Sequence, residues 1–148
     1  MCQIRKVIKT DIEALAELER MCFSTPWSQQ SFSEEIDNDL ACFFVATVSG
    51  QVVGYVGFLQ VVDEADITNI AVNPNFRRCK IGSKLMDRLI ETAVEKGLKK
   101  INLEVRKSNF AAQNLYDKFG FLPVGERKNF YRKPTEDAII MTKMLGDL

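Results

Sequence analysis

The chain has 148 residues, of which 46% are hydrophobic, and this size and composition predict one compact domain over residues 1–148. Histidine is absent, which excludes Ser-His-Asp and Cys-His catalysis and any metal site with an imidazole ligand. The four cysteines are widely spaced and form no Cys-x-x-Cys pair, so we expect free thiols, no metal and a reducing, cytoplasmic location. No apolar run approaches the ~18 residues of a membrane span, and we expect no membrane partner.

The 20 basic and 20 acidic side chains cancel to a net charge of zero, but they are unevenly distributed along the chain. Between residues 11 and 66 only Arg20 is basic, whereas residues 72–133 are rich in lysine and arginine. This separation suits one anionic and one cationic ligand better than nucleic acid, which favours an uncompensated basic face. We therefore expect no direct nucleic acid partner.

The first half of the chain combines short helices with alternating apolar segments. The patterns predict, in order, a strand at 3–8, a helix opened by a capping box at Thr10–Glu13, a short helix capped by Ser28, strands at 41–48 and 51–62 joined by a hairpin at Ser49-Gly50, and a strand at 67–72. This part therefore reads as an antiparallel meander with two helices.

The second half contains the most regular helical pattern. Apolar residues recur at helical spacing from Ile81 until Gly97, which can end the helix in a left-handed conformation. The patterns then predict a strand at 100–105, a helix at 108–119 capped by Ser108 and ended by Gly120, and strands at 121–127 and 138–145 separated by a loop that holds residues 129–131 and Pro134. Glu104 points away from the apolar face of its strand. We expect an α/β fold with a mixed, mostly antiparallel sheet of six to seven strands and helices on both faces.

An anion site is predicted where the strand at 70–72 breaks at Pro74 and the chain restarts as a helix. The segment between them contains Arg77, Arg78, Lys80, Gly82 and Ser83. Free backbone N–H groups, the positive end of the helix dipole and cationic side chains converge here, as a phosphate group requires. Taken alone, the segment leaves open an ordinary strand-to-helix turn with solvated arginines.

Several short motifs are spread along nearly the whole chain. They are Phe23-x-x-Pro26-Trp27-Ser28, Asp63-Glu64-Ala65, Asn69-Ile70-Ala71-Val72, the segment 77–83, Leu103-Glu104-Val105-Arg106 with Ser108-Asn109, Leu115-Tyr116, Gly120-Phe121, Asn129-Phe130-Tyr131 and Asp137–Met141. Each is weak alone, but together the chain resembles the GNAT superfamily of N-acetyltransferases, and within it the RimI-like protein N-terminal acetyltransferases. The resemblance implies the GNAT fold with a V-shaped opening between the central strands.

The resemblance also implies that acetyl-CoA binds beside the strand that ends at Val72, with no metal. The free strand edge bonds the pantetheine amides, the N–H near Val72 polarises the thioester carbonyl, and the loop binds the pyrophosphate. The residues expected to bind acetyl-CoA are Ile70, Ala71, Val72, Arg77, Arg78, Cys79, Lys80, Ile81, Gly82, Ser83 and Asn109. Lys80 departs from the family pattern Arg-x-x-Gly-x-Gly/Ala, and a positive φ there costs lysine about 1 kcal/mol or more relative to glycine.

Two proton transfers are needed for acetylation of an amine. A peptide α-amine with a pKa near ~8 must lose a proton, and the departing CoA thiolate must gain one. The resemblance assigns Glu104 as the proton acceptor, acting through water, and Tyr116 as the donor. From pattern alone, a solvated or salt-bridged Glu104 and a core Tyr116 remain open. Cys79 lies in the phosphate loop, so we expect direct transfer without an acyl-enzyme.

The acceptor of the acetyl group is also implied by the resemblance. Residues matching Trp27 and Tyr131 line the peptide groove in the family, although such aromatics can also be core or lid residues. Asp63 is either a surface charge or faces a basic peptide N-terminus, which the acidic half of the chain would suit. Asn109 can be a helix cap, a ligand of the CoA arm, or both. The implied partner is the N-terminus of a protein, in particular the N-terminal alanine of a small-subunit ribosomal protein. A small-molecule amine, a lysine side chain, and a non-catalytic acyl-CoA-binding regulatory module remain as alternatives.

Overall fold

The computed structural model describes residues 1–146, without the side chain of Arg78. In chain order the elements are β1 (Cys2–Lys6), the 3-10 turn η1 (Lys9–Asp11), α1 (Ile12–Cys22), α2 (Gln29–Ile36), β2 (Ala41–Val48), β3 (Gln51–Val61), β4 (Glu64–Val72), the 3-10 turn η2 (Pro74–Cys79), α3 (Ile81–Glu95), β5 (Lys100–Arg106), α4 (Phe110–Lys118), β6 (Leu122–Tyr131) and β7 (Glu136–Met144). Most lie within a few residues of the predicted positions.

The seven strands form one sheet in the order β1-β2-β3-β4-β5-β7-β6. Every neighbouring pair is antiparallel except β4 and β5, which are parallel and are connected through η2 and α3. A parallel pair needs such a crossover connection, since a hairpin joins only antiparallel strands. The prediction of a mixed, mostly antiparallel sheet is confirmed.

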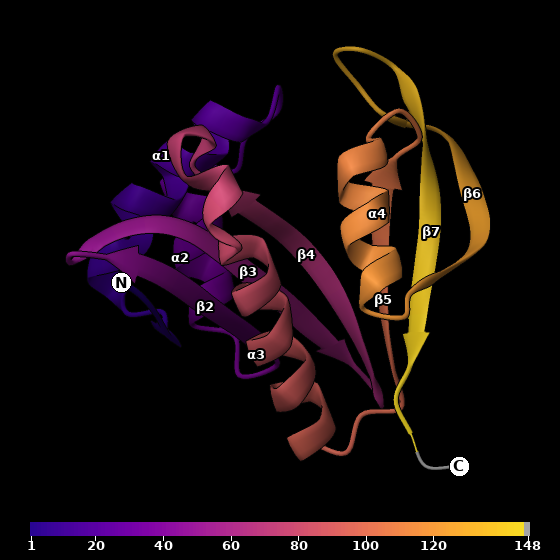
Figure 1. Ribbon diagram of the computed structural model, residues 1–148, viewed down its shortest axis with the longest axis horizontal. Coiled ribbons are helices and arrows are strands. Elements are labelled where there is room, and N and C mark those ends of the chain that lie inside the picture. Colours follow the sequence, from indigo (N-terminus) through magenta and orange to yellow (C-terminus); the bar gives the residue numbers. More distant parts are fainter. Residues whose placement is uncertain (147–148) are drawn as a thin grey trace.

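Helices cover both faces of the sheet, as predicted (Figure 1). On one face, α3 and α4 pack on a core that includes Leu85, Leu89 and Leu103. On the other face, α1 and α2 pack on a second core that includes Leu15 and Phe32. The amphipathic patterns of the helices supply these two apolar layers, since each helix buries one stripe against the sheet.

A bulge in the β3–β4 pair changes which side chains of β4 face each layer. The register shifts between Gly57 and Phe58. Ile67 and Ile70 are three residues apart, yet both belong to the layer under α3 and α4, whereas strict alternation would place them on opposite faces. Asn69 consequently faces α1, where its amide reaches Glu19.

The N-cap positions of α1 and α4 lie one residue after the predicted ones. Thr10 does not cap α1. Instead the Asp11 carboxylate accepts the Ile8 N–H at 2.8 Å and pairs with Arg5, also at 2.8 Å. At α4 the cap is Asn109 rather than Ser108. At α4 the Asn109 side-chain oxygen accepts a free N–H of the first turn, which is why it is the cap. Asp11 makes no side-chain cap bond to α1, because its carboxylate is turned back to Ile8 and Arg5.

Two further differences concern strand ends. β4 begins at Glu64, three residues before the predicted start. Residues 129–131, predicted to lie in a loop, belong to β6, where the register shifts between Arg127 and Tyr131 and Asn129 has a φ of 52°. The four cysteines are free thiols, as predicted. No helix within residues 1–146 is long and apolar enough to cross a membrane.

Candidate active site

The central strands β4 and β5 separate along most of their length. They pair only through residues 64–66 of β4 and 100–102 of β5, and no further pair between them forms within the described residues. Figure 1 shows the two strands diverging from their shared lower end. The facing edges therefore offer free backbone N–H and C=O groups to a ligand. Ile70, Ala71 and Val72 lie on this open part of β4, and the predicted V-shaped opening is confirmed.

The loop after β4 ends in a left-handed residue. The Asn73 side chain accepts the Asn75 N–H at 2.9 Å, which caps η2. Lys80 then adopts φ 60° and ψ 25° as the N-cap of α3. A lysine therefore occupies the backbone region that favours glycine, and the expected backbone strain of a lysine with a positive φ is present. Cys79 is exposed in the same loop, and the side chain of Arg78 lies outside the described part.

The first turn of α3 presents hydrogen-bond donors toward the opening. Its first intrahelical bond runs from the Lys84 N–H to the Lys80 carbonyl at 3.1 Å. The N–H groups of residues 81–83 therefore precede the first helical acceptor and need partners from outside the helix. The exposed Lys80 lies at this end, where the helix dipole is positive, whereas the Arg77 guanidinium donates to the Val72 carbonyl at 3.3 Å. This arrangement fits a pyrophosphate group.

Gly82 lies where three elements meet. A Cβ atom on Gly82 would lie 3.5 Å from Leu115 Cδ2 and 4.0 Å from Val72 Cγ2. The start of α3 thus touches the end of β4 and the turn of α4 that carries Tyr116. These are ordinary contact distances, so alanine also fits at this position, in agreement with the family pattern.

Glu104 lies on the face of β5 that is turned away from α3 and α4. Its neighbours Leu103 and Val105 are buried in the core under those helices, whereas the Glu104 side chain is 30% exposed. The carboxylate Oε2 lies 2.9 Å from Nε of Arg127, which reaches it from β6 across β7. Glu104 is therefore ion-paired and partly exposed to solvent. A salt-bridged Glu104 was one of the alternatives that the sequence pattern allowed.

Tyr131 lies close enough to Glu104 and to Tyr116 for electrostatic effects between them. Tyr116 is buried on α4 against Phe121, and burial, with a smaller effect of Tyr131, raises its pKa above the usual value. Burial, together with the negative charge of Glu104, raises the pKa of Tyr131 to about 12, while Arg106 acts in the opposite direction. The structure thus places Tyr131 near Glu104 and near Tyr116, and both phenols are protonated at neutral pH.

Trp27 lies in the segment between α1 and α2, and its position is held by a buried carboxylate. Its ring packs against Phe32 at 5.3 Å between centroids. Its backbone N–H donates to Glu19 Oε1 at 2.8 Å. Glu19 is fully buried, and Oε2 also accepts from the Tyr55 hydroxyl and, at 2.8 Å, from the Asn69 amide. Glu19 therefore joins α1, the segment with Trp27, β3 and β4.

Asn109 and Asp63 lie at opposite ends of β5. The Asn109 side chain accepts the Ala112 N–H at 3.1 Å, so this residue is a helix cap at the open end. Asp63 lies in the turn between β3 and β4, where its carbonyl accepts the Lys99 N–H at 2.7 Å. This turn adjoins the paired end of β4 and β5, four residues along β5 from Glu104. The structure therefore does not bring Asp63 together with the other predicted residues.

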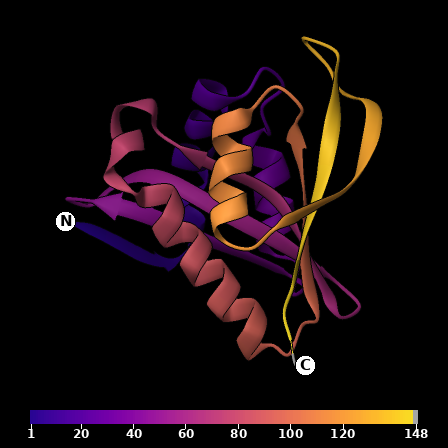
Figure 2. The ribbon, with the colours of Figure 1, turned by 45° about the vertical axis from the view of Figure 1, so that its right-hand side comes forward.

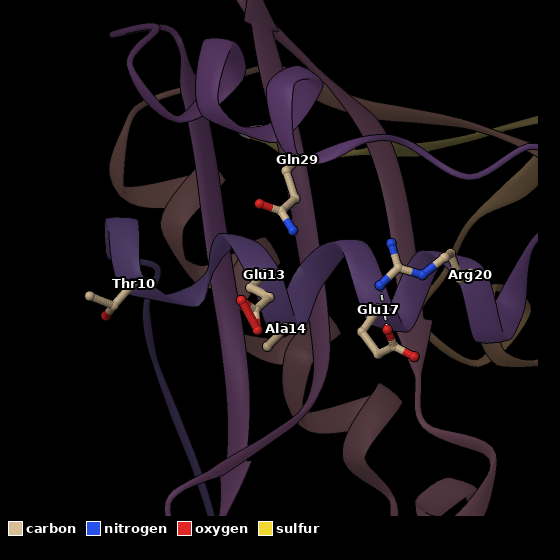
Figure 3. A pocket seen from close by; sticks show the side chains of 6 residues that line it. All are labelled: Thr10, Glu13, Ala14, Glu17, Arg20 and Gln29. Atoms are coloured by element: carbon tan, nitrogen blue, oxygen red, sulfur yellow. Dashed lines mark hydrogen bonds and ion pairs between the residues drawn. The ribbon is translucent and has the colours of Figure 1, made fainter.

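A surface hollow of about 510 Å³ lies outside this region (Figure 3). Its lining residues are Thr10, Glu13, Ala14, Glu17 and Arg20 from η1 and α1, with Gln29 from α2. Glu17 and Arg20 form an ion pair along the helix. None of the predicted site residues lines this hollow, so it is not part of the candidate active site.

Residues 12–121 match the model of the acetyltransferase (GNAT) family. The chain belongs to this family. The match covers the opening between β4 and β5, the loop before α3, Glu104 and Tyr116.

Similarity to individual GNAT proteins extends over nearly the whole chain. A Bacillus subtilis protein, named provisionally as a [ribosomal protein bS18]-alanine N-acetyltransferase, is 41% identical over 139 residues, which cover 93% of this chain and 92% of the relative. The Escherichia coli [ribosomal protein bS18]-alanine N-acetyltransferase is 35% identical over 145 residues, 95% of this chain and 96% of the relative. A crystal structure of the Escherichia coli ribosomal-protein-S18-alanine N-acetyltransferase superposes with a TM-score of 0.93 at 33% identity, covering 100% of this chain and 96% of that one. The resemblance to RimI-like GNAT proteins is confirmed.

Three charged residues of the site were missed at the sequence level. Arg127 pairs with Glu104, Arg106 lies over Tyr131, and Glu19 holds Trp27. For Glu19 a signal existed, because it follows Leu15 by four residues and therefore lies on the buried stripe of α1. For the two arginines no local pattern was available, since their partners come from other strands.

Proposed function

We propose that the protein transfers the acetyl group of acetyl-CoA to the α-amino group of a protein N-terminal alanine, with the small-subunit ribosomal protein bS18 as its substrate. The observation that carries the proposal is the end-to-end match to the Bacillus subtilis and Escherichia coli relatives whose names state this reaction. Membership of the GNAT family supports acetyl transfer in general. The names of the relatives support the alanine acceptor and the ribosomal protein.

The chain's own groups fit acetyl-CoA at the open edge of β4. When bound, acetyl-CoA supplies a thioester whose acetyl carbon the amine attacks, with CoA leaving as a thiolate. Residues 70–72 offer backbone groups to the pantetheine amides, apart from the Val72 carbonyl, which already accepts from Arg77 and Cys22. The N–H groups of residues 81–83, with the cations Arg77 and Lys80, suit the pyrophosphate. The start of α3 lies close to Val72 at Gly82, so both parts of the ligand would be held by adjacent backbone.

Glu104 is the residue we assign to accept the proton of the α-ammonium group. The amine can attack only after this proton is lost, and the chain contains no histidine to take it. The Glu104 carboxylate is partly exposed on the face opposite α3 and α4, so water can connect it to an amine in the opening. Arg127 keeps the carboxylate in place through a 2.9 Å ion pair.

Tyr116 is the residue we assign to protonate the departing thiolate. Burial holds its pKa above the usual phenol value, so the hydroxyl carries its proton at every pH where the enzyme would work. It is carried by α4 one residue after Leu115, which lies next to Gly82 and hence beside the start of α3. A phenol at this position supplies the proton to the CoA thiolate, while Glu104 on β5 accepts the proton of the α-ammonium group.

The test of this proposal is a CoA-release assay combined with mass spectrometry of the acceptor. Acceptors would be a peptide that begins with Ala-Arg and has a free N-terminus, the same peptide with a blocked N-terminus and an internal lysine, and a set of small amines. We expect turnover on the free N-terminal alanine alone, with the acetyl group located on the α-nitrogen. Acetylation confined to lysine or to small amines would refute the proposed acceptor while leaving acetyl transfer intact.

A calorimetric titration with acetyl-CoA separates binding from chemistry. We expect saturable binding at one site per chain. Binding without turnover on any acceptor would instead support a non-catalytic acyl-CoA-binding module. Absence of binding would refute the use of acetyl-CoA.

A further inference from the structure

Arg106 connects several parts of the candidate active site. It follows Glu104 by two residues on β5, so both side chains lie on the same face of the sheet. Its guanidinium donates to the carbonyl of Pro134 at 2.9 Å and to the carbonyl of Arg132 at 3.0 Å. These carbonyls belong to the turn between β6 and β7. Arg106 therefore ties the strand that carries Glu104 to this turn.

The same guanidinium lies over the aromatic ring of Tyr131, 4.5 Å from its centroid. Tyr131 is the last residue of β6, and its ring meets Phe130 edge-on at 5.0 Å. A cation at this distance is attracted to the face of the ring. The ring of Tyr131 is thus held between a guanidinium and a second aromatic side chain.

Glu136 extends this set of contacts to α4. One carboxylate oxygen lies 3.3 Å from Nη1 of Arg106, and the other accepts the Ser108 N–H at 2.6 Å. Ser108 directly precedes Asn109, the cap of α4, which is the helix that carries Tyr116. The Arg106–Glu136 pair is largely shielded, with side chains 25% and 18% exposed, so solvent weakens it less than the ion pairs at the surface.

The segment between α1 and α2 reaches the same turn. The Ser24 hydroxyl donates to the Arg132 carbonyl at 3.5 Å, the longest hydrogen bond in the set. Figure 2 shows this segment, the start of α4 and the β6–β7 turn at one end of the molecule. Trp27 lies in the segment between α1 and α2, and Tyr131 ends β6 just before the β6–β7 turn. Both residues were predicted to line the peptide groove.

We propose that Arg106 is a positioning residue that fixes Tyr131 relative to Glu104, and so sets the binding of the acceptor peptide. The inference rests on the proposed function, since it assigns the wall of the same acceptor site. A guanidinium suits this role because its planar fork of five donors can serve two carbonyls and a carboxylate while its face stacks on a ring. A lysine ammonium has no such fork and no planar face, so it can replace the charge but not the geometry.

The first experiment compares Arg106→Met and Arg106→Lys with wild type. We expect KM for the alanine peptide to rise about tenfold in Arg106→Met, with a smaller rise in Arg106→Lys, because a misplaced wall weakens acceptor binding. The dissociation constant for acetyl-CoA, measured by calorimetry, should stay within twofold, since Arg106 does not contact the loop before α3. Lys107→Gln is the matched control, because it removes the neighbouring cation and only the exposed pair with Glu126. It should leave KM unchanged.

The second experiment asks whether Arg106 acts through Tyr131. In a double-mutant cycle, Arg106→Met should raise KM much less in a Tyr131→Leu background than in wild type, because the ring that Arg106 holds is already gone. Equal effects in the two backgrounds would overturn the proposal. So would an unchanged KM in Arg106→Met. If Arg106→Met fails to fold, the same cycle is run with Arg106→Lys.

A readout without an acceptor keeps this inference separate from the proposed function. Amide hydrogen exchange of residues 131–133, 135 and 136 should quicken in Arg106→Met and Arg106→Lys and stay at the wild-type rate in Lys107→Gln. Unchanged exchange would show that Arg106 does not hold the turn, whatever the substrate. Faster exchange without a change in KM would mean that Arg106 stabilises the turn without affecting acceptor binding, which would also overturn the proposal. If wild type acetylates no N-terminal peptide, the proposed function fails while the exchange result still reports on Arg106.

Discussion

The carboxylate of Glu104 lies 2.9 Å from the guanidinium Nε of Arg127, and the two residues come from strands that are separated by β7. The pair is exposed, with side chains 30% and 57% accessible. Exposed ion pairs contribute at most about 1 kcal/mol to folding. The contact therefore orients the carboxylate more than it stabilises the chain, and Glu104 can be replaced without unfolding the protein.

Replacement of Glu104 should separate catalysis from folding. We expect Glu104→Gln to lower kcat for the alanine peptide by about 10²–10⁴, because the amide cannot accept the proton of the α-ammonium group. Thermal unfolding and acetyl-CoA affinity should change little. Steady-state kinetics with calorimetry would check this. Glu126→Gln removes the same charge from an exposed pair on β6 and should keep full activity; near-full turnover in Glu104→Gln would overturn the assignment.

Tyr116→Phe should lower kcat by about 10² while the ring remains packed against Phe121. Steady-state turnover on the alanine peptide measures this effect. Retention of full turnover would exclude Tyr116 as the donor to the thiolate.

The raised pKa of Tyr116 also predicts how stability depends on pH. Its unfolded-state pKa is about 10, and burial raises the folded-state pKa above that value. Above pH ~10 the unfolded chain loses this proton while the folded chain keeps it, so the free energy of unfolding should fall as pH rises. Urea unfolding between pH 8 and 11 should show a shallower fall in Tyr116→Phe than in wild type. Equal slopes would contradict the raised pKa.

Glu19→Gln should destabilise the fold by about 1–3 kcal/mol at neutral pH, because an amide offers one acceptor oxygen where three donors converge. Urea unfolding measures this cost. Glu17→Gln on the exposed side of α1 is the control and should cost under about 0.5 kcal/mol.

The cost of Glu19→Gln should also vary with pH. Burial raises the pKa of Glu19 despite its three hydrogen bonds. The folded chain then binds a proton more readily than the unfolded chain, so this residue's contribution to stability is complete below the ordinary value near 4.5 and decreases as pH rises through the folded-state pKa. The difference in unfolding free energy between wild type and Glu19→Gln should therefore be larger at pH 4.5 than at pH 8. The opposite trend would mean that the hydrogen bonds outweigh burial.

Local patterns predicted the elements of the fold well and the contacts between distant strands poorly. Helix α3 and the hairpin at Ser49-Gly50 follow from spacing and turn residues within one segment. The outward direction of Glu104 follows from strand alternation. The partners of Arg106 and Arg127 depend on the register shift in β6, and no period in the sequence encodes a bulge. The separation of β4 and β5 was expected only from the family resemblance, since each strand has an ordinary pattern by itself.

Lys80 allows the backbone and the charge of the phosphate loop to be tested separately. Its φ of 60° strains a lysine but not a glycine. Lys80→Gly should therefore raise the free energy of unfolding by about 1 kcal/mol, as measured by urea unfolding. Lys80→Ala removes the charge and keeps a Cβ atom in the same backbone conformation. It should therefore raise the free energy of unfolding much less than Lys80→Gly.

The same two variants report on acetyl-CoA binding. Since the N–H groups of residues 81–83 remain in place, the dissociation constant for acetyl-CoA in Lys80→Gly should stay within about tenfold of wild type. Lys80→Ala should weaken binding by a similar factor if the ammonium group attracts the pyrophosphate, because both variants lose the charge. Calorimetry at low and high salt would show this, with the difference from wild type shrinking at high salt. A loss of binding far beyond tenfold in Lys80→Gly alone would mean that the left-handed backbone at this position needs its side chain to hold the loop.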